Sequence, residues 1–174
     1  MNETVKTIKS RRSCKKFLDN PVPQELIDEI LECGMSAPSG KGLQSAIILA
    51  VTNKEVRELL RHENALALGK EDIDPFYGAP VILVVLAKKD IFTHVYDGSI
   101  VAENMLLAAH SLGLGACWIH RAKEEFESEV GKKILKDAGI TDEYEGIANI
   151  IVGYRDGEVL PFKPRKENYV YYIK

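Results

Sequence analysis

A basic run near the N-terminus carries the residue types that a phosphate group needs. Residues 10–17 read SRRSCKKF. They combine the hydroxyl group of Ser13 with the cationic side chains of Arg11, Arg12, Lys15 and Lys16. A phosphate monoester carries a charge of about −1.5 to −2, and its acceptor oxygens are well matched by guanidinium donors. The same composition is typical of a solvated basic face on a short helix, so the residues alone leave both interpretations open.

Two glycine-containing segments resemble nucleotide-binding loops but lack their defining residues. Residues 39–42 read SGKG. A phosphate loop needs Gly-x-x-x-x-Gly-Lys followed by Ser or Thr, and Gly42 stands where the metal-binding hydroxyl is required. The pair Gly113 and Gly115 lacks the third glycine of a dinucleotide fingerprint, because Trp118 occupies that position. We therefore expect neither of these two binding modes.

The reactive side chains suggest no hydrolytic or metal-dependent chemistry. His120 follows a short apolar segment, and it could donate a proton in a reaction or lie at the rim of a pocket. The three cysteines, Cys14, Cys33 and Cys117, form no Cys-x-x-Cys pair and have no histidine at metal-ligand spacing. Their odd number is typical of a reducing cytoplasm, so we expect a cytoplasmic protein without a metal site.

Length and composition indicate one soluble globular domain. The chain has 174 residues, of which 45% are hydrophobic and 28% charged, and its net charge is −3. A chain of this length can bury about 70% of its unfolded surface. The negative net charge argues against nonspecific binding of nucleic acid, and no apolar run is long enough to span a membrane.

Apolar periodicity predicts the elements that position these residues. Helical spacing predicts helices over residues 24–35, 54–68, from 96 or 97 to 112, and 123–138. Continuous apolar runs predict strands over 46–52, 81–87, 116–120 and 147–152, the first of them buried on both faces. We expect Val5 and Ile8 to pack inward from a short N-terminal segment. Strands that alternate with helices favour, by pattern alone, a parallel sheet.

The C-terminal segment is composed differently from the rest. After Gly153 the chain is rich in proline, lysine and tyrosine. If it were extended, Tyr169, Tyr171 and Ile173 would point to one face, with Val170 and Tyr172 on the other. Such a tail cannot bury itself, so we expect an added strand on another surface, such as that of a second subunit.

Four motifs together resemble the nitroreductase family of flavin enzymes. Residues 11–17 (RRSCKKF) match the family's Arg-x-Ser-x-Arg/Lys-x-Phe run, and residues 37–44 (APSGKGLQ) match its Ala-Pro-Ser-x-x-x-x-Gln loop. Residues 113–119 (GLGACWI) and 163–166 (KPRK) match two later motifs. Four matches in the family's order, spread over nearly the whole chain, indicate the family without indicating one particular enzyme.

The resemblance implies an α+β fold of the nitroreductase type. Its centre would be a mainly antiparallel sheet with helices on both faces, and the whole chain, residues 1–174, would be a single domain. The family forms homodimers in which a C-terminal extension, here about residues 153–174, reaches onto the partner subunit. The antiparallel sheet conflicts with the parallel sheet that the pattern of strands and helices favours.

The resemblance also implies an FMN site at the subunit boundary. The basic run and the late Lys-x-Arg would surround the phosphate and ribityl chain, and a loop of the opposite subunit would line the same flavin. Lys15 would lie near N1 and O2 of the flavin ring, where a cation stabilises the negative charge of the reduced form. The cofactor-binding residues implied in this way are Arg11, Arg12, Ser13, Lys15, Pro38, Ser39, Gly40, Gly42, Gln44, Trp118, Ile119, His120, Arg121, Lys163 and Arg165.

The implied activity is an oxidoreductase reaction. Hydride would pass from NADH or NADPH to flavin N5, and two electrons would then pass to a nitroaromatic, a quinone or another small acceptor, with His120 as the candidate catalytic residue. Gly42, Ser45-Ala46 and His120-Arg121 depart from the family's usual residues at these positions. Two alternatives stay open: a phosphate or nucleic-acid-binding module without catalysis, and a flavin-binding protein without acceptor turnover.

Overall fold

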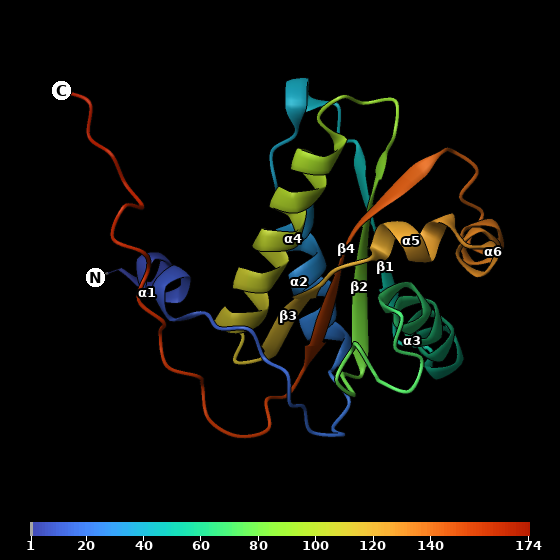
Figure 1. The fold of residues 1–174 in the computed structure, drawn as a ribbon, viewed down its shortest axis with the longest axis horizontal. Coiled ribbons are helices and arrows are strands. Elements are labelled where there is room, and N and C mark those ends of the chain that lie inside the picture. The colour runs from blue at the N-terminus through green and yellow to red at the C-terminus, as the bar shows by residue number, and fades with distance from the viewer. Residues whose placement is uncertain (1) are drawn as a thin grey trace.

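An antiparallel sheet forms the centre of the structure, a computed structural model that describes residues 2–174 (Figure 1). Its strands are β1 (Ala46–Val51), β2 (Val81–Lys88), β3 (Gly115–Ile119) and β4 (Tyr144–Gly153), in the order β1-β2-β4-β3. The helices are α1 (Glu3–Ser10), α2 (Gln24–Met35), α3 (Lys54–Leu68), α4 (His94–Ser111), α5 (Ala122–Glu127) and α6 (Glu129–Asp137), with a short 3-10 helix η1 (Gly40–Gly42).

The sheet topology settles the conflict between the two sequence-based predictions. Every neighbouring pair of strands is antiparallel, so the mainly antiparallel sheet is confirmed and the parallel sheet is wrong. β2 and β3 do run parallel to each other across the α4 crossover, but β4 inserts between them and is antiparallel to both. The alternation of strands and helices cannot reveal this insertion, because β4 follows much later in the chain.

Two hydrophobic cores lie on the two faces of the sheet. Along β2, Val81, Leu83 and Val85 belong to the core formed with α2 and α4. The residues between them, such as Ile82 and Val84, belong to the opposite core, which Leu60 of α3 and Phe126 of α5 complete. Successive side chains of a strand point to opposite faces, so both sets are buried and β2 reads as one continuous apolar run. Figure 1 shows the two helical layers on either side of the sheet.

Strand β1 is less buried than its sequence predicted. It forms the edge of the sheet beside β2, and its residues are half-buried except for exposed Ala50 and buried Val51. The prediction of a strand buried on both faces is therefore wrong within a single chain. An apolar edge strand presents unpaired backbone groups to whatever packs against it.

The predicted helix over residues 123–138 is two helices. Ser128 separates α5 from α6 with extended backbone angles (φ −71°, ψ 161°), and its Oγ accepts a hydrogen bond from the amide of Gly131 at 3.1 Å. Serine is a favoured N-cap residue because its hydroxyl satisfies an otherwise free amide at a helix start. The apolar spacing continues across the break, so periodicity alone could not locate it.

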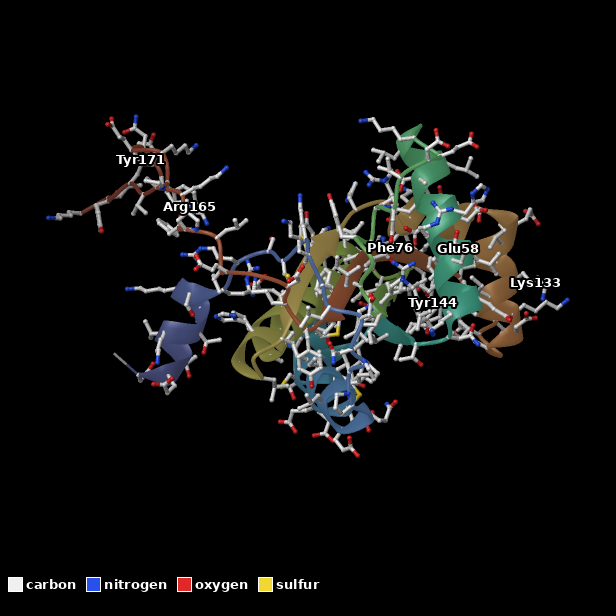
Figure 2. The ribbon with its side chains drawn as sticks, turned by 90° about the horizontal axis from the view of Figure 1, so that it is seen from below. Glu58, Phe76, Lys133, Tyr144, Arg165 and Tyr171 are labelled. Carbon is white, nitrogen blue, oxygen red and sulfur yellow. The ribbon has the colours of Figure 1, made fainter. Side chains whose placement is uncertain are left out.

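Helix α1 and the C-terminal tail lie on the same side of the molecule, away from the sheet (Figure 1). Val5 and Ile8 of α1 are 37% and 55% exposed, so the prediction that they pack inward is wrong within one chain. Residues 154–174 form no strand, and Tyr171 and Tyr172 are 77% and 84% exposed. Figure 2 shows Arg165 and Tyr171 beyond the body of the molecule, near α1. The arm onto a partner subunit stays a prediction.

Within residues 2–174, no helix combines the length and the apolar character needed to cross a membrane.

Candidate functional site

The basic run is fixed as an extended segment along the edge strand β3. The amide of Cys14 donates to the carbonyl of Ala116 at 2.9 Å, and the amide of Leu18 donates to the carbonyl of Tyr154 at 2.9 Å. Cys14 is buried, and a Cβ atom at Gly115 would lie 2.7 Å from its Sγ, so the close approach requires glycine there. The basic residues are therefore held by the sheet and do not form a loose tail.

A cavity of about 590 Å³ lies between this segment, the end of β3 and the loop after α3. It brings together six of the predicted cofactor-binding residues, namely Ser13, Lys15, Trp118, Ile119, His120 and Arg121. The facing wall was not predicted, and it consists of Leu68, Ile73, Asp74, Pro75 and Tyr77. His120 lines the cavity with an exposed side chain, and Cys117 lines it from a buried position. Burial raises the pKa of the Cys117 thiol, which agrees with a packing role.

The wall opposite β3 is held by the carboxylate of Asp74. This carboxylate accepts hydrogen bonds from Arg57 Nη2 at 2.6 Å and from the amides of Phe76 and Gly78, each at 2.8 Å. Burial alone would raise the pKa of Asp74, but these hydrogen bonds outweigh it and lower that pKa. The loop so fixed places the ring of Tyr77 5.3 Å from the ammonium nitrogen of Lys15. Lysine over an aromatic face is a cation–π contact.

Cations from both ends of the chain meet on the ring of Phe162. The guanidinium carbon of Arg12 lies 4.9 Å from the ring centroid, and that of Arg165 lies 5.2 Å from it. The family resemblance implies that the N-terminal run and the late Lys-x-Arg converge on a flavin at a subunit boundary, and their role toward a flavin stays a prediction. Lys163 is exposed in the same stretch. Within residues 2–174, the buried Nε of Arg12 has no hydrogen-bond partner.

His110 lies near three arginines beside this cluster. Its Nε2 lies 2.8 Å from the hydroxyl of Ser10. Burial lowers the pKa of His110, and the charges of Arg155, Arg11 and Arg12 lower it further. Neither His110 nor Arg155 was predicted as part of the site, because neither lies in a motif. The charge of these three arginines makes this surface suitable for an anion.

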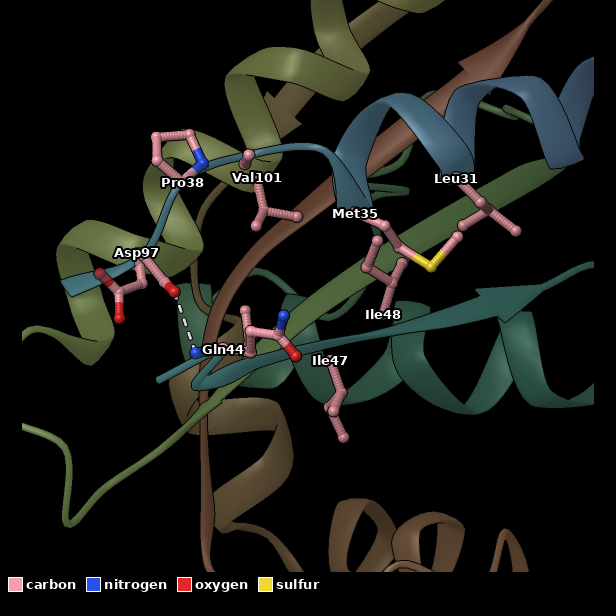
Figure 3. A pocket seen from close by; sticks show the side chains of 11 residues that line it. Leu31, Met35, Pro38, Gln44, Ile47, Ile48, Asp97 and Val101 are labelled. Atoms are coloured by element: carbon pink, nitrogen blue, oxygen red, sulfur yellow. Dashed lines mark hydrogen bonds between the residues drawn. The ribbon is translucent and has the colours of Figure 1, made fainter. Parts of the chain in front are cut away.

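A second group of predicted residues lies elsewhere, beside the edge strand β1. Pro38, Ser39 and Gln44 line a separate cavity of about 610 Å³, whose other walls are largely apolar and include Met35 and Ile48 (Figure 3). The amide of Gln44 donates to Ser39 Oγ at 2.9 Å, the contact drawn in Figure 3. A single chain therefore does not bring the two groups of predicted cofactor residues together.

Buried Asp97, in the first turn of α4, anchors this second loop. Its carboxylate accepts hydrogen bonds from the amide of Gly40 at 2.9 Å, from the hydroxyl of Ser45 at 2.7 Å and from that of Thr93 at 3.0 Å. Burial alone would raise the pKa of Asp97, but these bonds lower it. A Cβ atom at Gly40 would lie 2.4 Å from Thr93 Oγ1, and Gly42 has φ +68°. Packing and backbone angles thus account for both glycines within one chain.

The family assignment follows from a comparison with known sequences. A sequence model described as the nitroreductase family matches residues 8–154. The chain belongs to the nitroreductase family. The resemblance inferred from the four motifs is thereby confirmed, and so is the α+β fold of that family.

Individual relatives agree with the family assignment. A protein of Methanothermobacter thermautotrophicus is 37% identical over 120 residues, which cover 67% of this chain and 60% of that protein. An NADPH-flavin oxidoreductase of Vibrio harveyi is 34% identical over 129 residues, which cover 68% of this chain and 54% of that protein. The chain thus aligns with little more than half the length of these two relatives. The crystal structure of a nitroreductase with bound FMN from Bacteroides fragilis is 27% identical, with a TM-score of 0.90 and full coverage of both chains.

Proposed function

We propose that the protein is an FMN-dependent oxidoreductase that takes hydride from NADH or NADPH and passes two electrons to a nitroaromatic, a quinone or another small acceptor. The observation that carries this proposal is the cavity of about 590 Å³, in which Ser13, Lys15 and the segment from Trp118 to Arg121 meet. FMN, when bound, supplies the two-electron chemistry at its N5 atom. The protein binds and orients the reactants and excludes water.

The charges of the site fit a phosphate-bearing cofactor. Arg11, Arg12 and Arg155 lie close enough to His110 to lower its pKa. The only carboxylate paired with these arginines in residues 2–174 is that of Glu103, 3.9 Å from Arg11 and 53% exposed. Among residues 2–174 the buried Nε of Arg12 has no acceptor, so it is available to a ligand. We propose that Arg11, Arg12, Ser13, Lys163 and Arg165 hold the phosphate and ribityl chain.

The cavity itself fits a flat aromatic ring. Trp118 and Ile119 provide apolar surface, and Lys15 provides a positive charge whose present partner is the ring of Tyr77. A cation at this place stabilises electron density that builds up on a bound ring. We propose that Lys15 takes this role, and that the exposed imidazole of His120 donates a proton to the acceptor.

What is known of two relatives supports the cofactor and the electron donor. The Vibrio harveyi relative is named an NADPH-flavin oxidoreductase, and the Bacteroides fragilis structure contains FMN. A flavin cofactor and a nicotinamide donor are therefore the simplest assignment for this chain.

We further propose that the site is completed by a second copy of the chain. Pro38, Ser39 and Gln44 lie at the edge strand β1, apart from the cavity that holds Lys15. A homodimer allows the loop of one subunit to line the cavity of the other. The apolar side chains exposed on α4 and the tail, which such a dimer would cover, include Val95, Tyr96, Ile100, Leu160, Phe162 and Tyr172.

The proposal is tested with the purified protein and added FMN. We expect flavin absorption that is retained on gel filtration, is bleached by NADH or NADPH without oxygen, and recovers when a nitroaromatic or a quinone is mixed in by stopped flow. A double variant, Arg11→Ala with Lys15→Ala, should lose FMN. A colourless protein that takes up no FMN would contradict the proposal, and bleaching without recovery by any acceptor would favour a flavin-binding protein without turnover.

A further inference from the structure

A fully buried polar network lies directly behind the turn that carries His120 and Arg121. It consists of Asn64 from α3, Glu125 from α5 and Asn149 from β4, each with 0% exposure. None of the three was predicted as a site residue, and none lines the cavity. Buried carboxylates are rare unless they are paired, so Glu125 needs an explanation.

Asn64 connects this network to the cavity wall. Its Nδ2 donates to the carbonyl of His120 at 2.8 Å and also to Glu125 Oε1, while its Oδ1 accepts from Arg121 Nε at 3.0 Å. Both polar atoms of the amide are therefore used. Arg121 has φ +78°, a left-handed conformation that costs free energy for a residue other than glycine. The contacts of Asn64 stabilise that conformation from behind.

The remaining polar atoms of the network lack a hydrogen-bond donor in the described part of the chain, and a proton on Glu125 would supply one. Asn149 Nδ2 donates to Glu125 Oε1 at 2.8 Å. Within residues 2–174, Glu125 Oε2 and Asn149 Oδ1 are both buried and have no partner. Both atoms are acceptors if Glu125 is ionised, so both would stay buried without a hydrogen bond, which destabilises the folded state. A proton on Oε2 makes it a donor toward the amide oxygen of the same Asn149.

We propose that Glu125 is a neutral carboxylic acid in the folded protein, that it exchanges two hydrogen bonds with Asn149, and that through Asn64 it positions the His120–Arg121 turn. Its importance for the cofactor cavity rests on the function proposed above. Glu125 is a positioning residue, because it acts through Asn64 and does not touch the cavity.

The charges around Glu125 are consistent with this state. Burial raises the pKa of Glu125 to about 8. The hydrogen bonds from Asn64 and Asn149 and the charge of Arg121 lower this pKa, but burial outweighs them. Within residues 2–174 the guanidinium of Arg121 forms no ion pair with Glu125, and its Nε is used by Asn64. The charge of exposed Glu124 on the same helix raises the pKa of Glu125 further.

The backbone of α6 and of β4 packs closely against the backbone of α5, which carries Glu125. A Cβ atom at Gly131 would lie 2.2 Å from the carbonyl oxygen of Glu125, and one at Gly146 would lie 2.1 Å from that of Ala122. Glycine at these positions lets α6 and β4 approach α5 closely. A shift of α5 that exposed Glu125 would have to break both contacts.

The decisive variant is Glu125→Gln, with Glu124→Gln as the matched control on the exposed side of the helix. Glutamine offers an amide donor where the protonated acid has its hydroxyl, so it reproduces the neutral state at every pH. We therefore expect Glu125→Gln to fold as well as wild type. Failure of this variant to fold would overturn the proposal, because it would show that the negative charge is needed.

The stability of wild type relative to Glu125→Gln should depend on pH in a defined direction. The pKa of Glu125 is raised from 4.5 in the unfolded chain to about 8 in the folded protein, so the unfolded state releases the proton first. The ratio of the unfolding constant of wild type to that of Glu125→Gln should therefore rise about tenfold per pH unit between about pH 5 and 8 and then level off. Glu124→Gln should keep the wild-type slope. A flat ratio between wild type and Glu125→Gln over this range would overturn the proposal.

Two further measurements separate this inference from the proposed function. Infrared difference spectra between wild type and Glu125→Gln at pH 6 should show the carbonyl band of a protonated carboxylic acid, with or without flavin, and its absence would overturn the proposal. FMN affinity should be unchanged in Glu125→Gln and weaker by about tenfold in Glu125→Ala, as expected for the loss of one supporting hydrogen bond. Equal FMN affinity in both variants would overturn the positioning role.

Discussion

The hydroxyl of Ser45 donates a 2.7 Å hydrogen bond to the carboxylate of Asp97 and thereby ties the start of β1 to the first turn of α4. Ser45 is one of the positions at which the chain departs from the usual nitroreductase pattern. Its side chain is only 1% exposed. The departure is thus accompanied by a local hydrogen-bond network that fixes the loop from Ser39 to Gln44.

Replacing Asp97 should weaken this loop and the whole fold. We expect Asp97→Asn to lower the free energy of unfolding by about 2–3 kcal/mol, since its buried donors lose a charged acceptor. Ser45→Ala should lower it by about 1–2 kcal/mol, since the buried carboxylate of Asp97 then loses one donor. Urea unfolding at pH 7 measures both changes. The control is Ser99→Ala on the same helix, whose hydroxyl donates to the carbonyl of Val95 at 2.6 Å, and its effect should stay within about 0.5 kcal/mol.

The lowered pKa of Asp97 also predicts the direction in which the free energy of unfolding changes with pH. The pKa of Asp97 is lowered below 3.8 in the folded protein, so its contribution is present above that pH and is lost as the pH falls through the folded value. Asp97→Asn should therefore lose less stability than wild type on acidification below about pH 4. Unfolding curves from pH 6 to 3 check this expectation. An identical acid-induced loss in both proteins would show that Asp97 does not bind its donors as a carboxylate.

Asp74 should control the order of the cavity wall that carries Tyr77. Asp74→Asn replaces one acceptor oxygen by a donor, so the contacts to Arg57 and to the amides of Phe76 and Gly78 cannot all persist. We expect faster hydrogen exchange at these two amides, by about tenfold or more for each hydrogen bond lost. Asp72→Asn, in the same loop and exposed, is the control. Unchanged exchange in Asp74→Asn would refute this assignment.

His110 offers a test of the anion site that does not depend on turnover. Its pKa is lowered by burial and by the charges of Arg155, Arg11 and Arg12. A phosphate group bound by these arginines neutralises part of that charge, so the pKa of His110 should rise when FMN binds. An NMR titration of the imidazole with and without FMN measures the shift, and exposed His62 provides the internal control. A His110 pKa that FMN does not move would place the phosphate elsewhere.

The sequence located the strands and much of the cavity because both depend on local signals. Apolar runs marked β2 and β4, and the family motifs marked Lys15 and the segment ending at Arg121. The insertion of β4 between β2 and β3 is a long-range pairing, and no local pattern specifies it. The same holds for the edge position of β1.

The unpredicted site residues share a physical reason for being missed. Tyr77 and Asp74 lie in a loop without a motif, and their role depends on how that loop folds back against Lys15. Asn64 and Glu125 are polar residues in helices whose apolar spacing is otherwise regular, so they read as solvated positions. Only the packing of α3, α5 and β4 shows that both are buried.

The C-terminal tail should be required both for dimer formation and for FMN binding. Residues 158–174 carry apolar side chains that one chain leaves exposed, among them Val159, Leu160, Phe162, Tyr171 and Ile173. Ending the chain after Gly157 keeps the bond from the Asp156 amide to the carbonyl of Lys16 and removes those side chains. We expect the truncated protein to sediment as a monomer and to lose FMN, because the second loop of the site then has no partner cavity.

A point variant separates these two effects of the tail. Arg165→Ala removes one cation that faces the ring of Phe162 but keeps the apolar side chains. It should remain a dimer while its FMN affinity falls by about tenfold, as expected for the loss of one charged hydrogen bond. Sedimentation equilibrium and FMN titration measure the two properties on the same samples. A truncated protein that stays dimeric and binds FMN as wild type does would show that the tail has no part in the site.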